Sequence, residues 1–265
     1  MSEQLGQRVR AGRKLLMPYL MAGVTREWVE LIPALAEAGV DGLEIGLPFS
    51  DPMIDGVTVQ KAASRALSLG ATPSRMLDEL STLDNLGIPL TVMTYANVVF
   101  AHPGGSRAFL QRLADSGVAG VIVPDLPLEE SREFRVEAEA VEVSAVQLAA
   151  PECSDDRLAE IGAASRGFVY AVTAMQTTGE RAELAEGAVR TIERVRSHSE
   201  LPVVAGFGIS SPEQAVVLAG VADGVIIGSS VVRVLLETGS AAEVVELAGR
   251  YRTALDRVCE PVLVR

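Results

Sequence analysis

Short apolar runs alternate with longer amphipathic segments along the whole chain, and this alternation restricts the fold more than any other feature. Runs such as Val121-Ile122-Val123 are apolar at successive positions, which is typical of strands buried on both faces of a parallel sheet. The expected strands are Leu15–Leu20, Gly42–Ile45, Pro89–Thr94, Gly120–Val123, Ser144–Leu148, Gly167–Val172, Pro202–Ala205 and Gly224–Ile227. Eight strand-then-helix units of this kind predict an α/β fold.

The segments between these strands predict helices. Trp28–Ala38 carries apolar residues at helical spacing, and Asp155–Ile161 opens with acidic residues that suit a helix N-terminus. Thr191–Val195 and Ala241–Ala254 are also expected to be helical, and Met1–Arg13 predicts an extra N-terminal helix that covers the barrel floor. We therefore expect one (β/α)8 TIM barrel over residues 1–265, without a linker between domains. An open doubly wound sheet stays as the alternative, because the pattern does not show closure.

Composition narrows the class of partner. The net charge of −12 argues against nucleic acid and against an anionic membrane surface. No apolar run is long enough to span a bilayer, and the first residues lack the features of a signal peptide, so we expect a cytoplasmic protein. The two cysteines, Cys153 and Cys259, indicate neither a disulfide framework nor a zinc site.

Two carboxylates stand out near the second expected strand. Glu44 lies within the apolar strand itself, where poor hydration tends to raise a carboxyl pKa towards the range that a general acid/base needs. The structural alternative is a glutamate paired with a buried arginine. Asp55 lies in the following loop, where aspartates also serve as turn or cap residues. A strand-end glutamate and a loop aspartate can act on opposite sides of one substrate.

Two glycine-containing loops follow the last two expected strands, at Ala205–Gln214 and Ile227–Ser230. Glycines let backbone N–H groups approach an oxyanion, and a helix beginning near Ser229 adds its positive end. Barrel enzymes often bind phosphate with these two loops. The sequence therefore predicts a phosphate site at Gly208, Gly228 and Ser229, with packing glycines and ordinary serine caps as the alternative.

Lysine and histidine, which serve many other active sites, are scarce in this chain. The only lysines, Lys14 and Lys61, are not at strand ends, which argues against a Schiff-base aldolase. Two histidines, His102 and His198, are too few for a histidine-rich metal centre, although they leave an all-carboxylate site open. No dinucleotide-binding glycine fingerprint is placed correctly. We expect no metal and no organic cofactor. The chemistry that is left is acid/base catalysis by carboxylates on a phosphorylated substrate.

The residues described above resemble those of the tryptophan synthase α subunit family. The resemblance is carried by Leu43–Gly56, Met93–Asn97, Val123–Glu130, Gly167–Tyr170, Thr178-Gly179 and the two phosphate loops, in order along nearly the whole chain. It implies a lyase of tryptophan biosynthesis that cleaves indole-3-glycerol phosphate into indole and glyceraldehyde 3-phosphate. It also implies a β-subunit partner in an α2β2 assembly.

The resemblance implies a role for individual residues. Glu44 would be the general acid/base, and Asp55 would hydrogen-bond the indole N–H. The residues that would bind the rest of the substrate are Tyr95, Ile122, Tyr170, Thr178 and Phe207 for the indole and glycerol parts, and Gly179, Gly208, Gly228 and Ser229 for the phosphate.

The chain departs from the family pattern in its loops. Ile54 replaces a small residue before Asp55, Val57 replaces a proline, and Gln176 replaces a glycine, while Val24-Thr25 replaces an Asp-Pro pair. These changes leave every catalytic group in place, and we expect them to alter loop closure and docking onto a β subunit. Three hypotheses therefore remain: an α subunit in a complex, a stand-alone lyase that releases free indole, and a catalytically silent barrel that binds a ligand or activates a partner.

Overall fold

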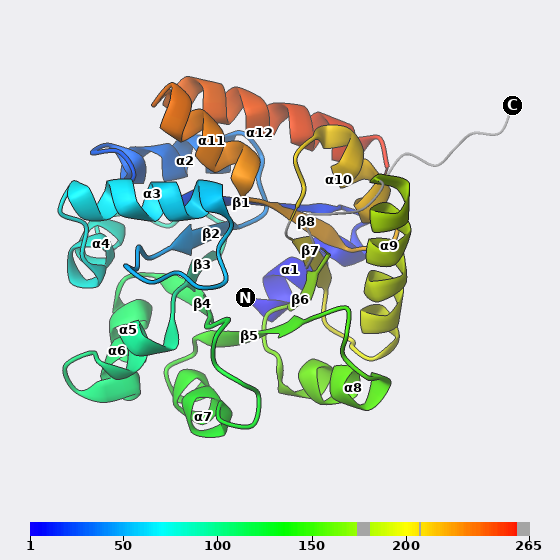
Figure 1. Cartoon of the computed structure of the whole chain (residues 1–265), viewed down its shortest axis with the longest axis horizontal. Helices are drawn as coiled ribbons and strands as arrows, with labels where there is room; N and C mark the ends of the chain where they lie inside the picture. Colours follow the sequence, from blue (N-terminus) through cyan, green and yellow to red (C-terminus); the bar gives the residue numbers. More distant parts are fainter. Residues whose placement is uncertain (174–180, 207, 259–265) are drawn as a thin grey trace, which may run out of the picture.

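The strands close into a barrel in sequence order from β1 to β8, and β8 pairs back onto β1 (Figure 1). Every strand pair is parallel. This computed structural model describes residues 1–173, 181–206 and 208–258. It confirms the closed TIM barrel and excludes the open sheet, because an open sheet would leave two unpaired edges.

All eight expected strands are present, with ends shifted by at most two residues. They are β1 Leu15–Met21, β2 Leu43–Gly46, β3 Leu90–Met93, β4 Val118–Ile122, β5 Ser144–Ala149, β6 Val169–Val172, β7 Val203–Gly206 and β8 Gly224–Ile227. The helices are α1 Ser2–Arg10, α2 Leu31–Glu37, α3 Val57–Ser68, α4 Pro73–Leu80, α5 Ala96–Phe100, α6 Gly105–Asp115, α7 Arg132–Ala140, α8 Asp155–Ala164, α9 Arg181–Ser197, α10 Pro212–Ala219, α11 Ser229–Glu237 and α12 Ala241–Asp256. None of the helices in the described ranges is long and apolar enough to cross a membrane.

The expected helix over Trp28–Ala38 is divided. A 3-10 turn, η1 Trp28–Glu30, precedes α2. Pro33 explains the division, because it has no N–H to donate to the carbonyl of Val29 and is tolerated only in the first turn of an α-helix. The α-helix therefore begins at Leu31 and not at Trp28.

Neighbouring strands set which side chains share the barrel interior. Tyr19 on β1 is in register with Glu44 on β2, and Glu44 is in register with Thr91 on β3. In a parallel sheet, residues in register point to the same face. Thr91 and Gly120, which is next in register on β4, both meet the side chain of Met1 inside the barrel. Tyr19 and Glu44 therefore also point inward.

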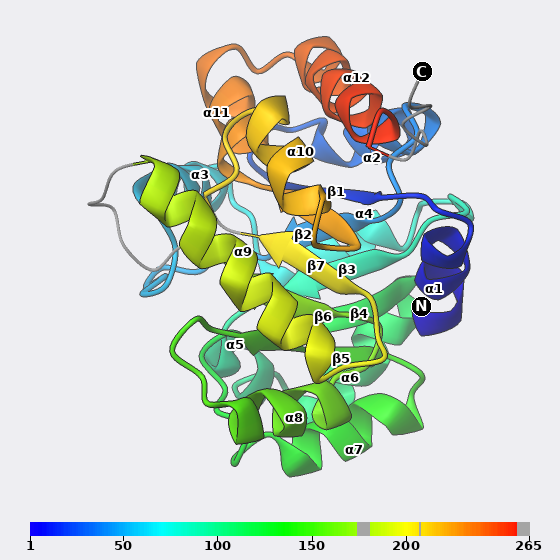
Figure 2. The same cartoon turned by 90° about the vertical axis from the view of Figure 1, so that its right-hand side faces the viewer.

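The N-terminal helix α1 covers the end of the barrel where the strands begin (Figure 2). Gly120 and Gly167 leave room for Met1, whose side chain would overlap a Cβ at either position. The N–H of Gly167 also donates to Ser2 Oγ at 2.8 Å. These contacts confirm the expected floor helix, which ends at Arg10 and not at Arg13.

A buried ion cluster fastens this floor to the rest of the chain. Asp41 is fully buried just before β2, and its carboxylate contacts Arg8 of α1 at 2.7 Å, Arg13 at 2.5 Å and Arg252 of α12 at 3.0 Å. The N–H of Leu16 on β1 donates to the same carboxylate at 3.0 Å. One carboxylate thus joins both ends of the chain to β1 and β2.

We expect Asp41→Asn to lower the free energy of unfolding by roughly 3 kcal/mol, because it leaves a cluster of arginines around a neutral group. Urea denaturation measures this change. Glu3→Gln is the matched control, since it breaks a pair with Arg10 in which both side chains are exposed, and such pairs add little. Equal effects of the two substitutions would contradict a structural role for the Asp41 cluster.

Candidate active site

Glu44 lies on β2 and points into the barrel with almost no solvent exposure (1%). Its Oε2 atom is buried and has no hydrogen-bond partner, and the side chain forms no ion pair with any residue that the structure describes. No described arginine forms the buried pair that the sequence offered as the structural alternative. An unpartnered carboxyl in such a place is costly unless it is protonated or serves a ligand.

Asp55 lies in the loop after β2 and is held by a tyrosine from the next strand end. The Tyr95 hydroxyl donates to Asp55 Oδ2 at 3.0 Å and accepts from the N–H of Ile54 at 3.3 Å. Phe49 stacks on the Tyr95 ring, with centroids 5.1 Å apart. Tyr95 therefore fixes both the aspartate and the backbone next to it at the mouth of the barrel.

Two tyrosines occupy the barrel interior opposite glycines. A Cβ at Gly46 would overlap the Tyr19 hydroxyl, and a Cβ at Gly206 would overlap the Tyr170 hydroxyl. Both tyrosines interact electrostatically with Glu44 and Asp55. The two carboxylates and two phenols thus share one region at the carboxyl ends of the strands.

Burial sets the protonation of this region. Desolvation, followed by the charge of Asp55, raises the pKa of Glu44 to about 8. Desolvation also raises the pKa of Asp55, and the hydrogen bond from Tyr95 opposes that rise. Burial raises the pKa values of Tyr19 and Tyr170 further above their ordinary value. Near neutral pH the site therefore combines a glutamate that can give or take a proton with phenols that keep theirs.

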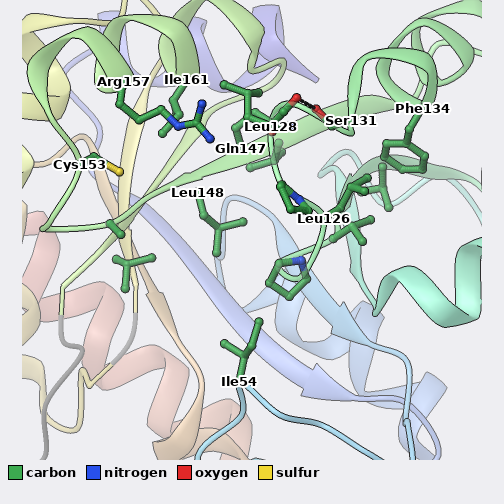
Figure 3. Close-up of a pocket in the computed structure, with 17 residues that line it drawn as sticks. Ile54, Leu126, Leu128, Ser131, Phe134, Gln147, Leu148, Cys153, Arg157 and Ile161 are labelled. Atoms are coloured by element: carbon green, nitrogen blue, oxygen red, sulfur yellow. Dashed lines mark hydrogen bonds between the residues drawn. The ribbon is translucent and has the colours of Figure 1, made fainter.

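An apolar cavity of about 590 Å³ adjoins the carboxylates (Figure 3). Ile54, next to Asp55, borders it from the loop, and Leu148 and Leu126 face Ile54 across it. Leu148 is in register with Tyr170, so the cavity reaches the same side of the barrel as Glu44. Farther from the mouth it continues between the barrel and helices α7 and α8, and it is lined there by Phe134, Gln147, Cys153, Arg157 and Ile161. The carboxylates themselves are not part of its lining.

The two glycine loops lie where the sequence predicted them. Gly208 has a φ of +81°, which a residue with a side chain rarely adopts. Gly228 precedes α11, no side chain caps that end of the helix, and Ser229 is its first residue. Among the described residues, the N–H groups of this first turn therefore have no side-chain acceptor.

The structure brings together the two predicted catalytic residues and two of the predicted substrate-binding residues. Glu44, Asp55, Tyr95 and Tyr170 share the site, and Ile122 is fully buried on β4 in register with Met93. Thr178, Gly179 and Phe207, together with Gln176 and Cys259, lie outside the described residues. Cys153 is a free cysteine that forms no disulfide. Within the residues that the structure covers, no cluster of His, Cys, Asp or Glu side chains is suited to bind a metal ion.

Sequence analysis missed Tyr19 and Leu148. The signal for Tyr19 was the same as for Glu44, a polar group within an apolar strand. Leu148 gave no signal in the sequence, because its place beside the site depends on the register of β5 with β6.

The sequence and the fold of this chain are both similar to those of one family of known proteins. The family profile described as "Tryptophan synthase alpha chain" matches residues 5–255. A tryptophan synthase alpha chain of Prochlorococcus marinus (strain MIT 9313) is 42% identical over 232 residues, which are 86% of this chain and 84% of the relative. The solved tryptophan synthase of M. tuberculosis in its aminoacrylate-bound form superposes with a TM-score of 0.84 at 33% identity, covering 95% and 99% of the two chains. The alpha subunit of Legionella pneumophila str. Paris gives 0.88 at 28% identity, covering 96% and 97%.

The raised pKa of Glu44 predicts a pH-dependent stability. Between pH 4.5 and about 8 the folded chain keeps the Glu44 proton that the unfolded chain has released. The free energy of unfolding should therefore fall with rising pH, relative to Glu44→Gln, by at most about 1.4 kcal/mol per pH unit. Urea unfolding of both chains at several pH values in this window measures the difference. A difference that stays constant with pH would contradict the raised pKa.

Proposed function

The chain belongs to the tryptophan synthase alpha chain family, and on that premise we propose that Glu44 and Asp55 catalyse the cleavage of indole-3-glycerol phosphate at the mouth of this barrel. The reaction is a carbon–carbon lyase step of tryptophan biosynthesis, and its products are indole and glyceraldehyde 3-phosphate. The observation that carries the residue assignment is the burial of Glu44 beside a second carboxylate, with its Oε2 atom unpartnered among the described residues.

Glu44 serves as the group that moves protons. The cleavage needs a proton on C3 of the indole ring, and it needs the loss of a proton from the hydroxyl on the carbon bonded to that ring. A carboxyl with a pKa of about 8 exists in both forms near neutral pH, so it can donate one proton and accept the other. The C–C bond then breaks as in a retro-aldol reaction.

Asp55 serves the nitrogen side of the ring. Protonation at C3 places positive charge on the indole, and a carboxylate that accepts a hydrogen bond from the indole N–H stabilises that charge. The bond from Tyr95 favours the ionised form of Asp55, as this role requires. The apolar cavity beside Ile54 and Leu148 offers the ring a hydrophobic surface within reach of Asp55.

The phosphate belongs at the loops after β7 and β8. The left-handed backbone at Gly208 and the uncapped start of α11 at Gly228 and Ser229 present N–H groups that suit a phosphate. In this proposal Gly179 adds a backbone contact and Thr178 positions Asp55, by resemblance to the family. The cytoplasmic location expected from the sequence is part of the same proposal.

The decisive test is indole release from indole-3-glycerol phosphate by the purified chain. We expect Glu44→Gln to lower kcat about 100-fold to 10,000-fold, because general acid/base catalysis contributes that much, while substrate binding changes little. Asp51→Asn is the control, since Asp51 is an exposed carboxylate in the same loop. A Glu44→Gln variant that keeps most of its activity would exclude Glu44 as the proton-transfer group, and an inactive unaltered chain would favour the silent barrel.

We further propose that the mouth of the barrel binds a tryptophan synthase β subunit. Large apolar side chains are exposed around it: Met53 (89%), Ile54 (43%) and Val57 (67%) in the β2–α3 segment, and Phe100 (49%) at the end of α5. Exposed apolar side chains gathered at one end of a molecule are typical of a docking surface. Three of them lie within four residues of Asp55, so a partner bound here would act directly on the catalytic loop.

Steady-state indole formation during titration with the cognate β subunit tests this partner. Docking that closes the loops over the substrate should raise kcat/KM about tenfold, which corresponds to about 1.4 kcal/mol of coupling. Met53→Ser should weaken the activation and leave the activity of the isolated chain unchanged. Activity that stays constant across the titration, with no complex on gel filtration, would instead support the stand-alone lyase.

A further inference from the structure

Tyr19 spans the distance between the two halves of the site. Its Cβ lies 3.6 Å from where a Cβ at Gly228 would be. Its hydroxyl lies against Gly46, two residues after Glu44 on β2. One end of the tyrosine is therefore next to the loop proposed for phosphate. The other end is next to the carboxylate proposed for proton transfer.

The Tyr19 hydroxyl has no partner within the described part of the chain. The residue is only 6% exposed, yet its oxygen takes part in no hydrogen bond there, unlike Tyr95 and Tyr251. Buried tyrosine hydroxyls usually find a hydrogen-bond partner, because the polar end is costly to leave unpaired. A ligand that enters the mouth of the barrel can supply such a partner.

The substrate has a group at the matching place. Its glycerol chain connects the phosphate to the indole ring, so it must pass between Gly228 and Glu44. We propose that the Tyr19 hydroxyl donates a hydrogen bond to the oxygen of the substrate hydroxyl that loses its proton to Glu44. This inference rests on the proposed lyase function and adds a residue to it.

The bond should matter more as the reaction proceeds. When the hydroxyl proton moves to the Glu44 carboxylate, negative charge grows on the substrate oxygen, and its electron pair forms the aldehyde carbonyl as the C–C bond breaks into the protonated ring. A donor already in place stabilises that charge. Because burial raises the pKa of Tyr19, the phenol keeps its own proton throughout and acts only as a donor.

A comparison of two ligands tests the assignment. Binding of indole-3-glycerol phosphate is measured in the Glu44→Gln background, which prevents cleavage, with and without Tyr19→Phe. The second ligand is 3-(indol-3-yl)propyl phosphate, which has the same ring and phosphate but no hydroxyls. We expect Tyr19→Phe to weaken substrate binding about fivefold and to leave binding of the propyl phosphate unchanged. With Glu44 intact, Tyr19→Phe should lower kcat/KM about tenfold or more.

Equal weakening for both ligands would overturn the proposal, because it would mean that Tyr19 only packs the barrel. Unchanged binding of both ligands with unchanged kcat/KM would overturn it too. Tyr251→Phe removes a buried phenol hydroxyl that donates to Ser230 of α11 and is the matched control, expected to affect the two phosphate ligands equally. Failure of the proposed function is distinguishable, since it would appear as a lack of indole release from the unaltered chain.

Discussion

The cost of burying a carboxylate governs the second strand and the residues just before it. Asp41, just before β2, is fully buried and is compensated by Arg8, Arg13 and Arg252. Glu44 is almost as buried and has no such compensation from the residues that the structure describes. The first arrangement holds the floor of the barrel together, and the second leaves a group whose proton is easily exchanged near neutral pH. The barrel thus keeps its structural charge and its reactive charge three residues apart, one just before this short strand and one within it.

Most of the fold could be predicted from the sequence, because strands buried on both faces leave continuous apolar runs. Closure could not, since it depends on the pairing of Leu15 with Gly224 across the whole chain. Glu44 was visible as a charge in an apolar strand. The Asp41 cluster could not be predicted, because its arginines come from segments far apart in sequence. The apolar cavity could not be predicted either, because Leu148 reaches it only through strand register.

The site divides its work between rigid and adaptable parts. Glu44, Tyr19 and Tyr170 project from strands in the packed interior, whereas Asp55 and Ile54 lie on a loop held by one tyrosine hydroxyl. Groups on strands keep their positions within narrow limits, and groups on loops can respond to a ligand or a partner. The proton-transferring residue is therefore on the rigid part, and the charge-stabilising residue is on the part that a docking subunit can reach.

The fit of Tyr19 over Gly46 and of Tyr170 over Gly206 also restricts how this sequence can evolve. While the tyrosine is present, any side chain at the glycine collides with it, so neither glycine can change first. A smaller residue in place of either tyrosine would open a void and release the constraint on its glycine. Each tyrosine–glycine pair is thus epistatic, because the order of mutations matters. A sequence that has lost the tyrosine can accept larger side chains at the glycine position, whereas this sequence cannot.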